Sequence, residues 1–194
     1  MGRYVVRELL SRGLAVRALA RDTRKAAAIL PRNDRLTLVS GDGTDPAALT
    51  SLVSGAQACV NCVGILREAG RGQTFKKVHI ETTRALTEAC VAAGVRRFVQ
   101  ISALGVSAEG KSHYQQSKYQ AEQIVRRSGL SWTILRPGLI HGKESGFMTL
   151  AKGWVTGEKA PWVFLPYFSR GVLTSDVPLA AIRREAATPA PVAA

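Results

Sequence analysis

A regular alternation of short apolar segments with helical segments constrains the fold of this chain more than any other feature. The apolar segments lie at residues 15–20, 36–39, 58–63, 97–102 and 132–140. Segments with helical periodicity lie before and between them, at residues 3–12, 25–30, 44–55, 74–93 and 114–128. Strands that are apolar on both faces are typical of a parallel sheet covered by helices on each side. With right-handed crossovers, the sequence predicts an α/β chain with a doubly wound parallel sheet, the Rossmann-type fold.

The chain begins with a helix, whereas a nucleotide-binding sheet of this type begins with a strand and a glycine-rich turn. Gly2 stands where the last glycine of that turn would stand. We therefore expect that the first strand is missing from the middle of the sheet, between the strands at 15–20 and 58–63. Unpaired backbone groups at the two edges predict a poorly stable chain that binds nucleotide weakly. The alternative is a different fold that starts with a helix.

The alternation of strands and helices stops after Gly142. We therefore predict an N-terminally truncated dinucleotide-binding domain at residues 1–142 and a partial, substrate-side segment at 143–194. The second segment contains the sequence APWVFLPYF and an Ala/Pro-rich tail. It does not resemble a complete second domain.

The charge balance is strongly positive, with 27 Lys and Arg against 14 Asp and Glu, a net charge of +13. Such a charge can indicate a nucleic-acid or anionic-membrane partner. However, the basic residues are scattered, and aromatic residues make up only 6% of the chain. We do not expect a nucleic-acid partner. Because no segment has the length or flanks of a membrane span or a secretory signal, we expect a cytoplasmic protein, or one peripheral to a membrane complex.

No metal site is expected from the cysteines and histidines. Cys59 and Cys62 have the spacing of a zinc or redox pair, but in a strand their side chains would point to opposite faces. His79 lies in a predicted helix, where a core or surface role is expected. His113 and His141 are the two histidines that could touch a site at the strand ends.

Tyr114 and Lys118 lie four positions apart and therefore on one face of a predicted helix. A nearby ammonium lowers the pKa of a phenol toward the range in which it can exchange protons, and the same lysine can bind a ribose. A tyrosine and a lysine at this spacing often occur by chance, so the prediction of a catalytic pair depends on where the pair lies in the fold. Ser102 ends the preceding strand, at the sheet edge where sites of such folds form. Its hydroxyl could hold a substrate oxygen there.

A set of motifs resembles the short-chain dehydrogenase/reductase superfamily. The motifs are GRYVVRELLSRG, Arg21 closing the second strand, GD at 41–42, ISALG at 101–105, YQQSK at 114–118 and LRPGLIHG at 135–142. Within that superfamily the pattern is similar to the atypical, extended type (NAD-dependent epimerase/dehydratase-like). The segment NCVGILREAGRGQTFKKVHIETTRAL at 61–86 particularly resembles the NADPH-binding accessory subunit of respiratory complex I.

The resemblance implies that Tyr114 and Lys118 are the catalytic pair and that Ser102 is the candidate hydroxyl. It also implies a set of cofactor-binding residues: Gly2, Arg21, Asp42, Val63, Gly64, Lys118, Pro137 and Gly138. In this set, Asp42 would contact the adenine of the cofactor. Val63 and Gly64 would contact its adenosine side, and the residues at 137–138 would contact its nicotinamide end.

Arg21 stands where NAD-specific relatives carry an acidic residue. A guanidinium there would suit the 2′-phosphate of NADP(H), and Arg24 and Lys25 could assist. Asp22 is adjacent. We therefore expect NADP(H) to be favoured over NAD(H).

The resemblance leaves more than one function open. The first is a reductase or epimerase that transfers hydride at a carbonyl or alcohol carbon of an unidentified small molecule. The second is a non-catalytic subunit that uses bound NADPH to stabilise a respiratory or other assembly. An RNA-associated role is raised only by the charge. The departures from the family pattern are Gly43 after Asp42, and Ala103 where a second hydroxyl residue is common.

Overall fold

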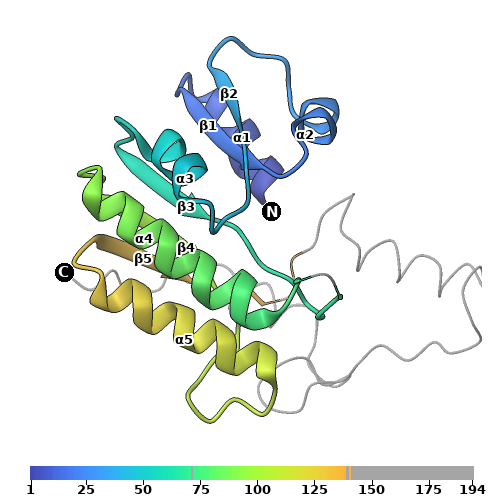
Figure 1. The fold of residues 1–194 in the computed structure, drawn as a ribbon, viewed down its shortest axis with the longest axis vertical. Coiled ribbons are helices and arrows are strands. Elements are labelled where there is room, and N and C mark those ends of the chain that lie inside the picture. The colour runs from blue at the N-terminus through green and yellow to red at the C-terminus, as the bar shows by residue number, and fades with distance from the viewer. Residues whose placement is uncertain (71, 139, 141–194) are drawn as a thin grey trace, which may run out of the picture. The chain divides into compact units, whose positions relative to one another are not determined.

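The structure is a computed structural model that describes residues 1–70, 72–138 and 140 (Figure 1). The described residues up to 138 belong to one compact unit. The predicted boundary at 142 and the predicted segment at 143–194 both lie outside the described residues. They stay predictions.

The strands are all paired in parallel, as predicted. β1 (Val16–Ala20) pairs with β2 (Leu36–Ser40), with Val16 opposite Leu36. β3 (Ala58–Asn61) pairs with β4 (Arg97–Ile101), and β4 pairs with β5 (Ser131–Leu135). The strands predicted at 58–63 and 132–140 are shorter in the structure, because after β3 and β5 the chain leaves the sheet and forms loops at its edge.

The sheet is divided into two parts. β1 and β2 form one, β3, β4 and β5 form the other, and within the described residues no backbone pairing joins β1 to β3. The division falls where the sequence predicted a strand to be missing, between the strands at 16–20 and 58–61. One edge of β1 and one edge of β3 thus carry backbone groups without a neighbouring strand.

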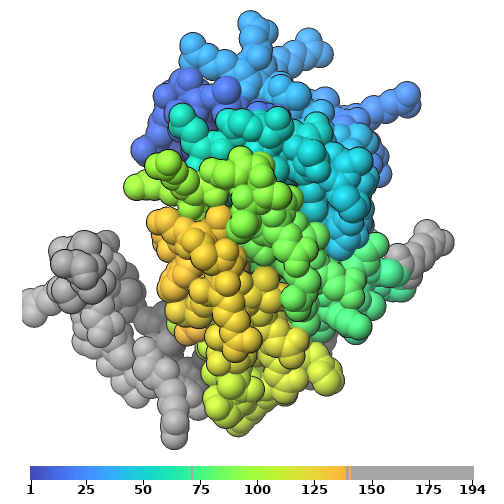
Figure 2. Space-filling model, turned by 60° about the vertical axis from the view of Figure 1, so that its left-hand side comes forward, coloured from blue at the N-terminus to red at the C-terminus, as the bar shows by residue number. Residues whose placement is uncertain are grey.

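Helices cover both faces of the strands, which confirms the doubly wound arrangement. α1 (Gly2–Ser11) and α2 (Thr23–Ile29) pack on β1 and β2. α3 (Pro46–Val53), α4 (Thr82–Ala92) and α5 (His113–Arg127) lie side by side as a layer on the opposite face (Figure 1). Figure 2 shows the same three helices in cyan, green and yellow along one side of the molecule.

Side-chain caps explain where several helices begin. The carboxylate of Asp45 accepts hydrogen bonds from the first turn of α3, where Pro46 supplies a suitable backbone angle. Ser112 and Gln115 form a capping box that starts α5 at His113. The cap fixes the start of the helix that carries Tyr114 and Lys118.

The helix predicted at 74–93 is interrupted by a wide turn. Residues Lys76–Glu81 form a π-helical turn, η1, which runs directly into α4. The hydroxyl of Thr82 donates to the Lys77 carbonyl at 3.1 Å, and the hydroxyl of Thr83 donates to the His79 carbonyl at 2.6 Å. The helix predicted at 74–93 is therefore present, but its first part is π-helical and only the part from Thr82 is α-helical. Turns of this kind are frequent at functional sites.

The hydrophobic core lies between the α3–α4–α5 layer and the strands. Its buried members are Leu49, Val53, Leu86, Cys90, Val95, Phe98 and Val125. Cys59 approaches Cys90 on α4, whereas Cys62 lies near Gly2 on α1, so the two sulfurs diverge as predicted. All three cysteines are free thiols.

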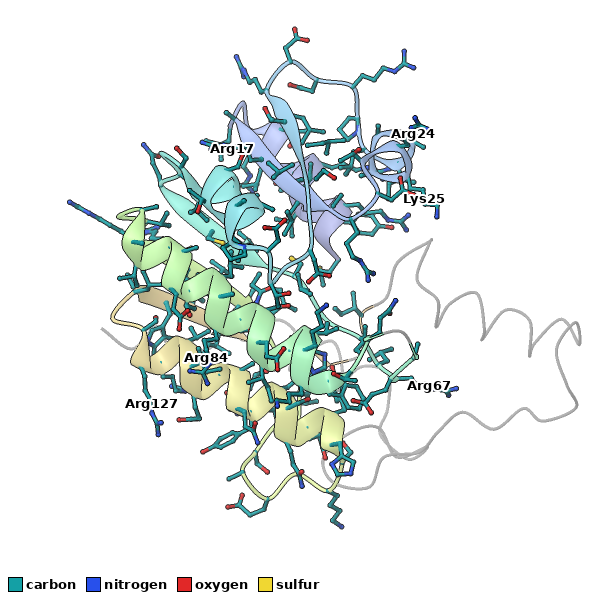
Figure 3. The ribbon with its side chains drawn as sticks, in the orientation of Figure 1. Arg17, Arg24, Lys25, Arg67, Arg84 and Arg127 are labelled. Atoms are coloured by element: carbon teal, nitrogen blue, oxygen red, sulfur yellow. The ribbon has the colours of Figure 1, made fainter. Side chains whose placement is uncertain are left out.

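Basic side chains are distributed over many elements. Figure 3 labels six of them, on β1 (Arg17), α2 (Arg24 and Lys25), the loop after β3 (Arg67), α4 (Arg84) and α5 (Arg127). Arg17 is not free for a ligand, because its guanidinium donates to the carbonyls of Ser51 and Ser54 at the end of α3. In the described part of the chain, no helix is long and apolar enough to cross a membrane.

Candidate functional site

The residues that follow the strands form the rim, which we define as 21, 41–42, 63–64, 102 and 137–138. Parallel strands bring their C-terminal ends to one edge of a sheet, and ligands of such folds bind there. Every cofactor-binding residue predicted from the sequence belongs to the rim, except Gly2 and Lys118. Two surface hollows, one between α4 and α5 and one beside the loops before β4 and β5, lie away from it.

Asp42 organises the turn after β2. Its carboxylate accepts hydrogen bonds from the Thr44 hydroxyl at 2.8 Å and the Thr44 backbone N–H at 3.1 Å. Lys77 Nζ lies 3.8 Å from the same carboxylate. The Thr44 hydrogen bond, together with the positive charges of Lys77 and Arg21, lowers the pKa of Asp42. The carboxylate is therefore ionised at neutral pH, and Arg21 is close enough to influence it.

Gly64 lies directly over Lys118. A Cβ atom at Gly64 would be 3.0 Å from Lys118 Nζ and 3.6 Å from His79 Nε2. A larger residue would therefore push the ammonium away from the rim.

Lys118 is buried, with 5% of its surface exposed. Its Nζ donates to the carbonyl of Ile101, at the end of β4, at 3.1 Å. Burial lowers the pKa of Lys118, and the charges of Cys62 and Glu122 act against that shift. One of the three ammonium protons is thus used by the strand end, which leaves donors for a sugar hydroxyl.

Tyr114 packs in an aromatic cluster with Phe75 and His79. The Tyr114 ring meets the His79 ring edge-on with centroids 5.6 Å apart, and it meets the Phe75 ring in the same way at 5.9 Å. Burial raises the pKa of Tyr114. The pKa of Tyr114 is therefore raised by burial and not lowered as expected from a neighbouring lysine, and the Lys118 ammonium donates to Ile101.

Ser102 is held by a buried carboxylate. Its hydroxyl donates to Glu122 Oε1 at 2.5 Å, and its backbone N–H donates to the Leu135 carbonyl at 2.7 Å. Glu122 also accepts two hydrogen bonds from Arg136, at 2.9 and 2.6 Å. Burial alone would raise the pKa of Glu122, but the hydrogen bonds from Arg136 and Ser102 outweigh it and lower the pKa. The Ser102 hydroxyl therefore has a strong partner other than a substrate.

The remaining predicted residues are held mainly through backbone contacts. The Val63 N–H donates to the buried side chain of Asn61 at 3.0 Å. The Pro137 carbonyl accepts from the Leu104 N–H at 2.9 Å, and a Cβ at Gly138 would lie 3.5 Å from the Leu104 side chain.

Gly2 is not required by close packing. A Cβ atom at Gly2 would lie 3.7 Å from Cys62 Cβ, which is an ordinary contact. The described contacts alone therefore do not explain a glycine at this position, and its cofactor role stays a prediction. His113 is an exposed residue at the start of α5, and His141 lies outside the described residues.

Four residues of the site were not identified from the sequence: His79, Ser117, Glu122 and Arg136. Glu122 lies one helical turn after Lys118, and Arg136 directly follows β5, so helical spacing and strand position could have suggested both. No local signal could have paired His79 with Ser117, which are 38 residues apart. Among the described residues, no cluster of three potential metal ligands exists.

Comparisons with known proteins identify the family of the chain. The family described as NAD(P)H-binding matches residues 1–158. The chain is 34% identical over 142 residues to a ceramide reductase of Caulobacter vibrioides, an alignment that covers 73% of this chain and 44% of that protein. It is 31% identical over 114 residues to subunit 9 of the NADH dehydrogenase 1 alpha subcomplex of Mus musculus, covering 59% of this chain and 30% of that protein.

Among solved structures, the Bordetella bronchiseptica enzyme WbmH in complex with NAD+ matches with a TM-score of 0.68 and 21% identity, covering 81% of this chain and 59% of that one. This likeness shows the Rossmann-type fold. The chain spans about half the length of the ceramide reductase and less than a third of the mitochondrial subunit. The resemblance inferred from the motifs is confirmed in its family: the chain belongs to the NAD(P)H-binding family.

Proposed function

We propose that the chain binds NADP(H) along the rim and belongs to a reductase that acts on a carbonyl or alcohol carbon. The observation that carries the proposal is the position of Lys118. Its ammonium lies beneath Gly64 at the end of β4, one helical turn from Tyr114. In this arrangement Lys118 would donate to the nicotinamide ribose, and Gly64 would let the cofactor approach it.

The preference for NADP(H) over NAD(H) is assigned to Arg21. Arg21 follows β1, and its positive charge is close enough to influence Asp42 at the end of β2. A guanidinium at this place can bind a 2′-phosphate through two parallel hydrogen bonds. Arg24 and Lys25, which Figure 3 labels, follow Arg21 closely in the chain and lie in the first turn of α2.

Tyr114 would act as the proton donor when a carbonyl is reduced. When bound, the dihydronicotinamide supplies a hydride to the carbonyl carbon. The Tyr114 phenol, which is protonated at neutral pH, gives its proton to the carbonyl oxygen and regains one from solvent. A role for Ser102 in holding that oxygen stays a prediction, because its hydroxyl would first have to leave Glu122.

A second candidate function is supported by a specific observation. Burial raises the pKa of Tyr114, and Ser102 is bound to Glu122, so the site lacks two features that favour turnover. A non-catalytic subunit that holds NADPH within a protein assembly would need neither feature. The match to a subunit of the mitochondrial NADH dehydrogenase supports this candidate.

Tyr114→Phe distinguishes the two candidates. We would titrate NADPH and NADH into the wild-type chain and the variant by calorimetry, and then measure NADPH oxidation with a panel of ketones and aldehydes. A reductase predicts that the variant retains NADPH affinity within about twofold and loses at least about a hundredfold in turnover. A binding subunit predicts equal affinity and no oxidation in either protein. If the wild type binds neither dinucleotide, both candidates are wrong.

A further inference from the structure

A continuous set of hydrogen bonds joins the loop after β3 to the first turn of α5. The Ile65 N–H donates to His79 Nε2 at 3.0 Å, and His79 Nδ1 lies 2.8 Å from Ser117 Oγ. Ser117 Oγ lies 2.8 Å from the Tyr114 carbonyl. His79 and Ser117 are 1% and 5% exposed, so water does not compete for these contacts.

The direction of each hydrogen bond follows from its partners. The Ile65 N–H can only donate, so His79 Nε2 must be unprotonated. The Tyr114 carbonyl can only accept, so Ser117 uses its single proton there. His79 Nδ1 must therefore carry a proton and donate it to Ser117. Only the neutral ring with its proton on Nδ1 satisfies all three contacts.

The His79 ring also lies close to Tyr114 on one side and to Gly64 on the other. It meets the Tyr114 ring edge-on and stacks on Phe75 with centroids 5.3 Å apart. On its other side, a Cβ atom at Gly64 would lie 3.6 Å from His79 Nε2. The histidine thus stands between the loop proposed to face the cofactor and the proposed proton donor.

We infer that His79, as the neutral Nδ1–H tautomer, is a positioning residue that sets the Gly64–Ile65 segment relative to Tyr114. The inference rests on the proposed function, because it assumes that this segment faces the dinucleotide. To hold this segment in place, the side chain must accept a hydrogen bond on one edge and donate one on the other. It must also be planar, because it packs against two aromatic rings. The π-helical turn η1 places His79 where it meets both partners.

Burial supports the assignment of a neutral ring. It lowers the pKa of His79 to about 4, and the nearby charge of Lys118 acts in the same direction. A protonated ring would direct a second N–H at the Ile65 N–H and break the contact with the loop.

The first test needs no substitution. The full chain is labelled with 15N-histidine, and the ring tautomers of its three histidines are read by NMR at neutral pH. We expect one ring, assigned to His79 by its loss in a His79→Gln sample, to carry its proton on Nδ1. An Nε2–H tautomer or a charged ring at this position would overturn the inference.

The second test measures binding of NADPH to three variants. His79→Gln retains an acceptor for the Ile65 N–H, whereas His79→Phe retains the ring packing and neither hydrogen bond. We expect NADPH affinity to fall about tenfold in His79→Phe and less than about threefold in His79→Gln. His113→Phe, at an exposed position, is the control and should bind as the wild type does.

The outcomes separate the inference from the proposed function. Equal NADPH affinity in the wild type, His79→Phe and His79→Gln overturns the positioning role and leaves the proposed function standing. Failure of the wild type to bind NADPH or NADH overturns both. If His79→Phe does not fold, the tautomer measurement on the wild type still decides the inference.

Discussion

The Ser102 hydroxyl donates a 2.5 Å hydrogen bond to Glu122, a carboxylate with no exposed surface. Because Glu122 also accepts from Arg136, one side chain of α5 joins the ends of β4 and β5. This contact places Ser102 in the framework that supports the rim. The sequence alone leaves two roles open for Ser102, a structural hydroxyl and a substrate-binding one, and the hydrogen bond to Glu122 supports the structural role.

Loss of the Glu122 charge should destabilise the fold. Glu122→Gln leaves Arg136, which is partly exposed, without its ionic partner, and we expect the free energy of unfolding to fall by about 2 kcal/mol. Ser102→Ala should cost about 1 kcal/mol. Urea unfolding measures both, with Glu88→Gln on the exposed face of α4 as a control near zero. Unchanged stability in Ser102→Ala with lost carbonyl reduction would show instead that Ser102 binds the substrate.

Stability should decrease in mildly acidic solution because of His79. Its pKa is lowered by burial to about 4 in the folded chain, whereas an unfolded histidine titrates near about 6.5. Between these values the unfolded state binds a proton that the folded state does not, so the free energy of unfolding falls as the pH decreases. Urea unfolding from pH 7 to pH 4 measures this slope. In His79→Gln, the free energy of unfolding should change less with pH over the same range. An equal slope in the variant and the wild type would contradict the lowered pKa of His79.

A methyl group at position 64 should weaken cofactor binding. Gly64→Ala places Cβ 3.0 Å from Lys118 Nζ, so the ammonium must move from the place proposed for the ribose. We expect NADPH affinity, measured by calorimetry, to fall about tenfold. This is the effect of losing about one hydrogen bond, the one proposed between Lys118 and the ribose. Gly70→Ala is the matched control, since a Cβ there meets nothing within 4 Å. Equal binding by both variants would exclude Lys118 from the cofactor site.

Removal of the Arg21 guanidinium should change the choice of cofactor. Arg21→Ala is expected to reduce NADPH affinity by about tenfold and to leave NADH affinity unchanged, because only NADPH carries the 2′-phosphate. Arg32→Ala, an exposed change of equal charge, is the control for general electrostatic attraction. A parallel loss for both dinucleotides would argue against a 2′-phosphate contact at Arg21.

Much of the fold could be predicted because its signals are local. The strand predicted at 97–102 and the helix predicted at 114–128 follow from an apolar run and from helical periodicity, and the structure contains both. The division of the sheet could be predicted because a helix opens the chain where a strand was expected. The turn η1 could not, since its residues have ordinary helical periodicity and its width depends on hydroxyl contacts within the folded helix.

The site was predictable in position and less so in chemistry. Strand ends identify Arg21, Asp42, Gly64 and Ser102 as rim residues before any coordinates are known. The partners of these residues depend on contacts across long sequence separations. Ser102 and Glu122 are 20 residues apart, and His79 and Ser117 are 38 apart. No periodicity along the chain encodes such pairs.

The divided sheet sets which part of the fold opens last. Among the described strands, β4 alone is hydrogen-bonded on both sides, and its Phe98 is completely buried. Amide hydrogens of β4 should therefore exchange with deuterated solvent most slowly, while those on the unpaired edges of β1 and β3 should exchange early. In such a molecule, β1 and β2 would melt as a unit before the part that carries Tyr114 and Lys118.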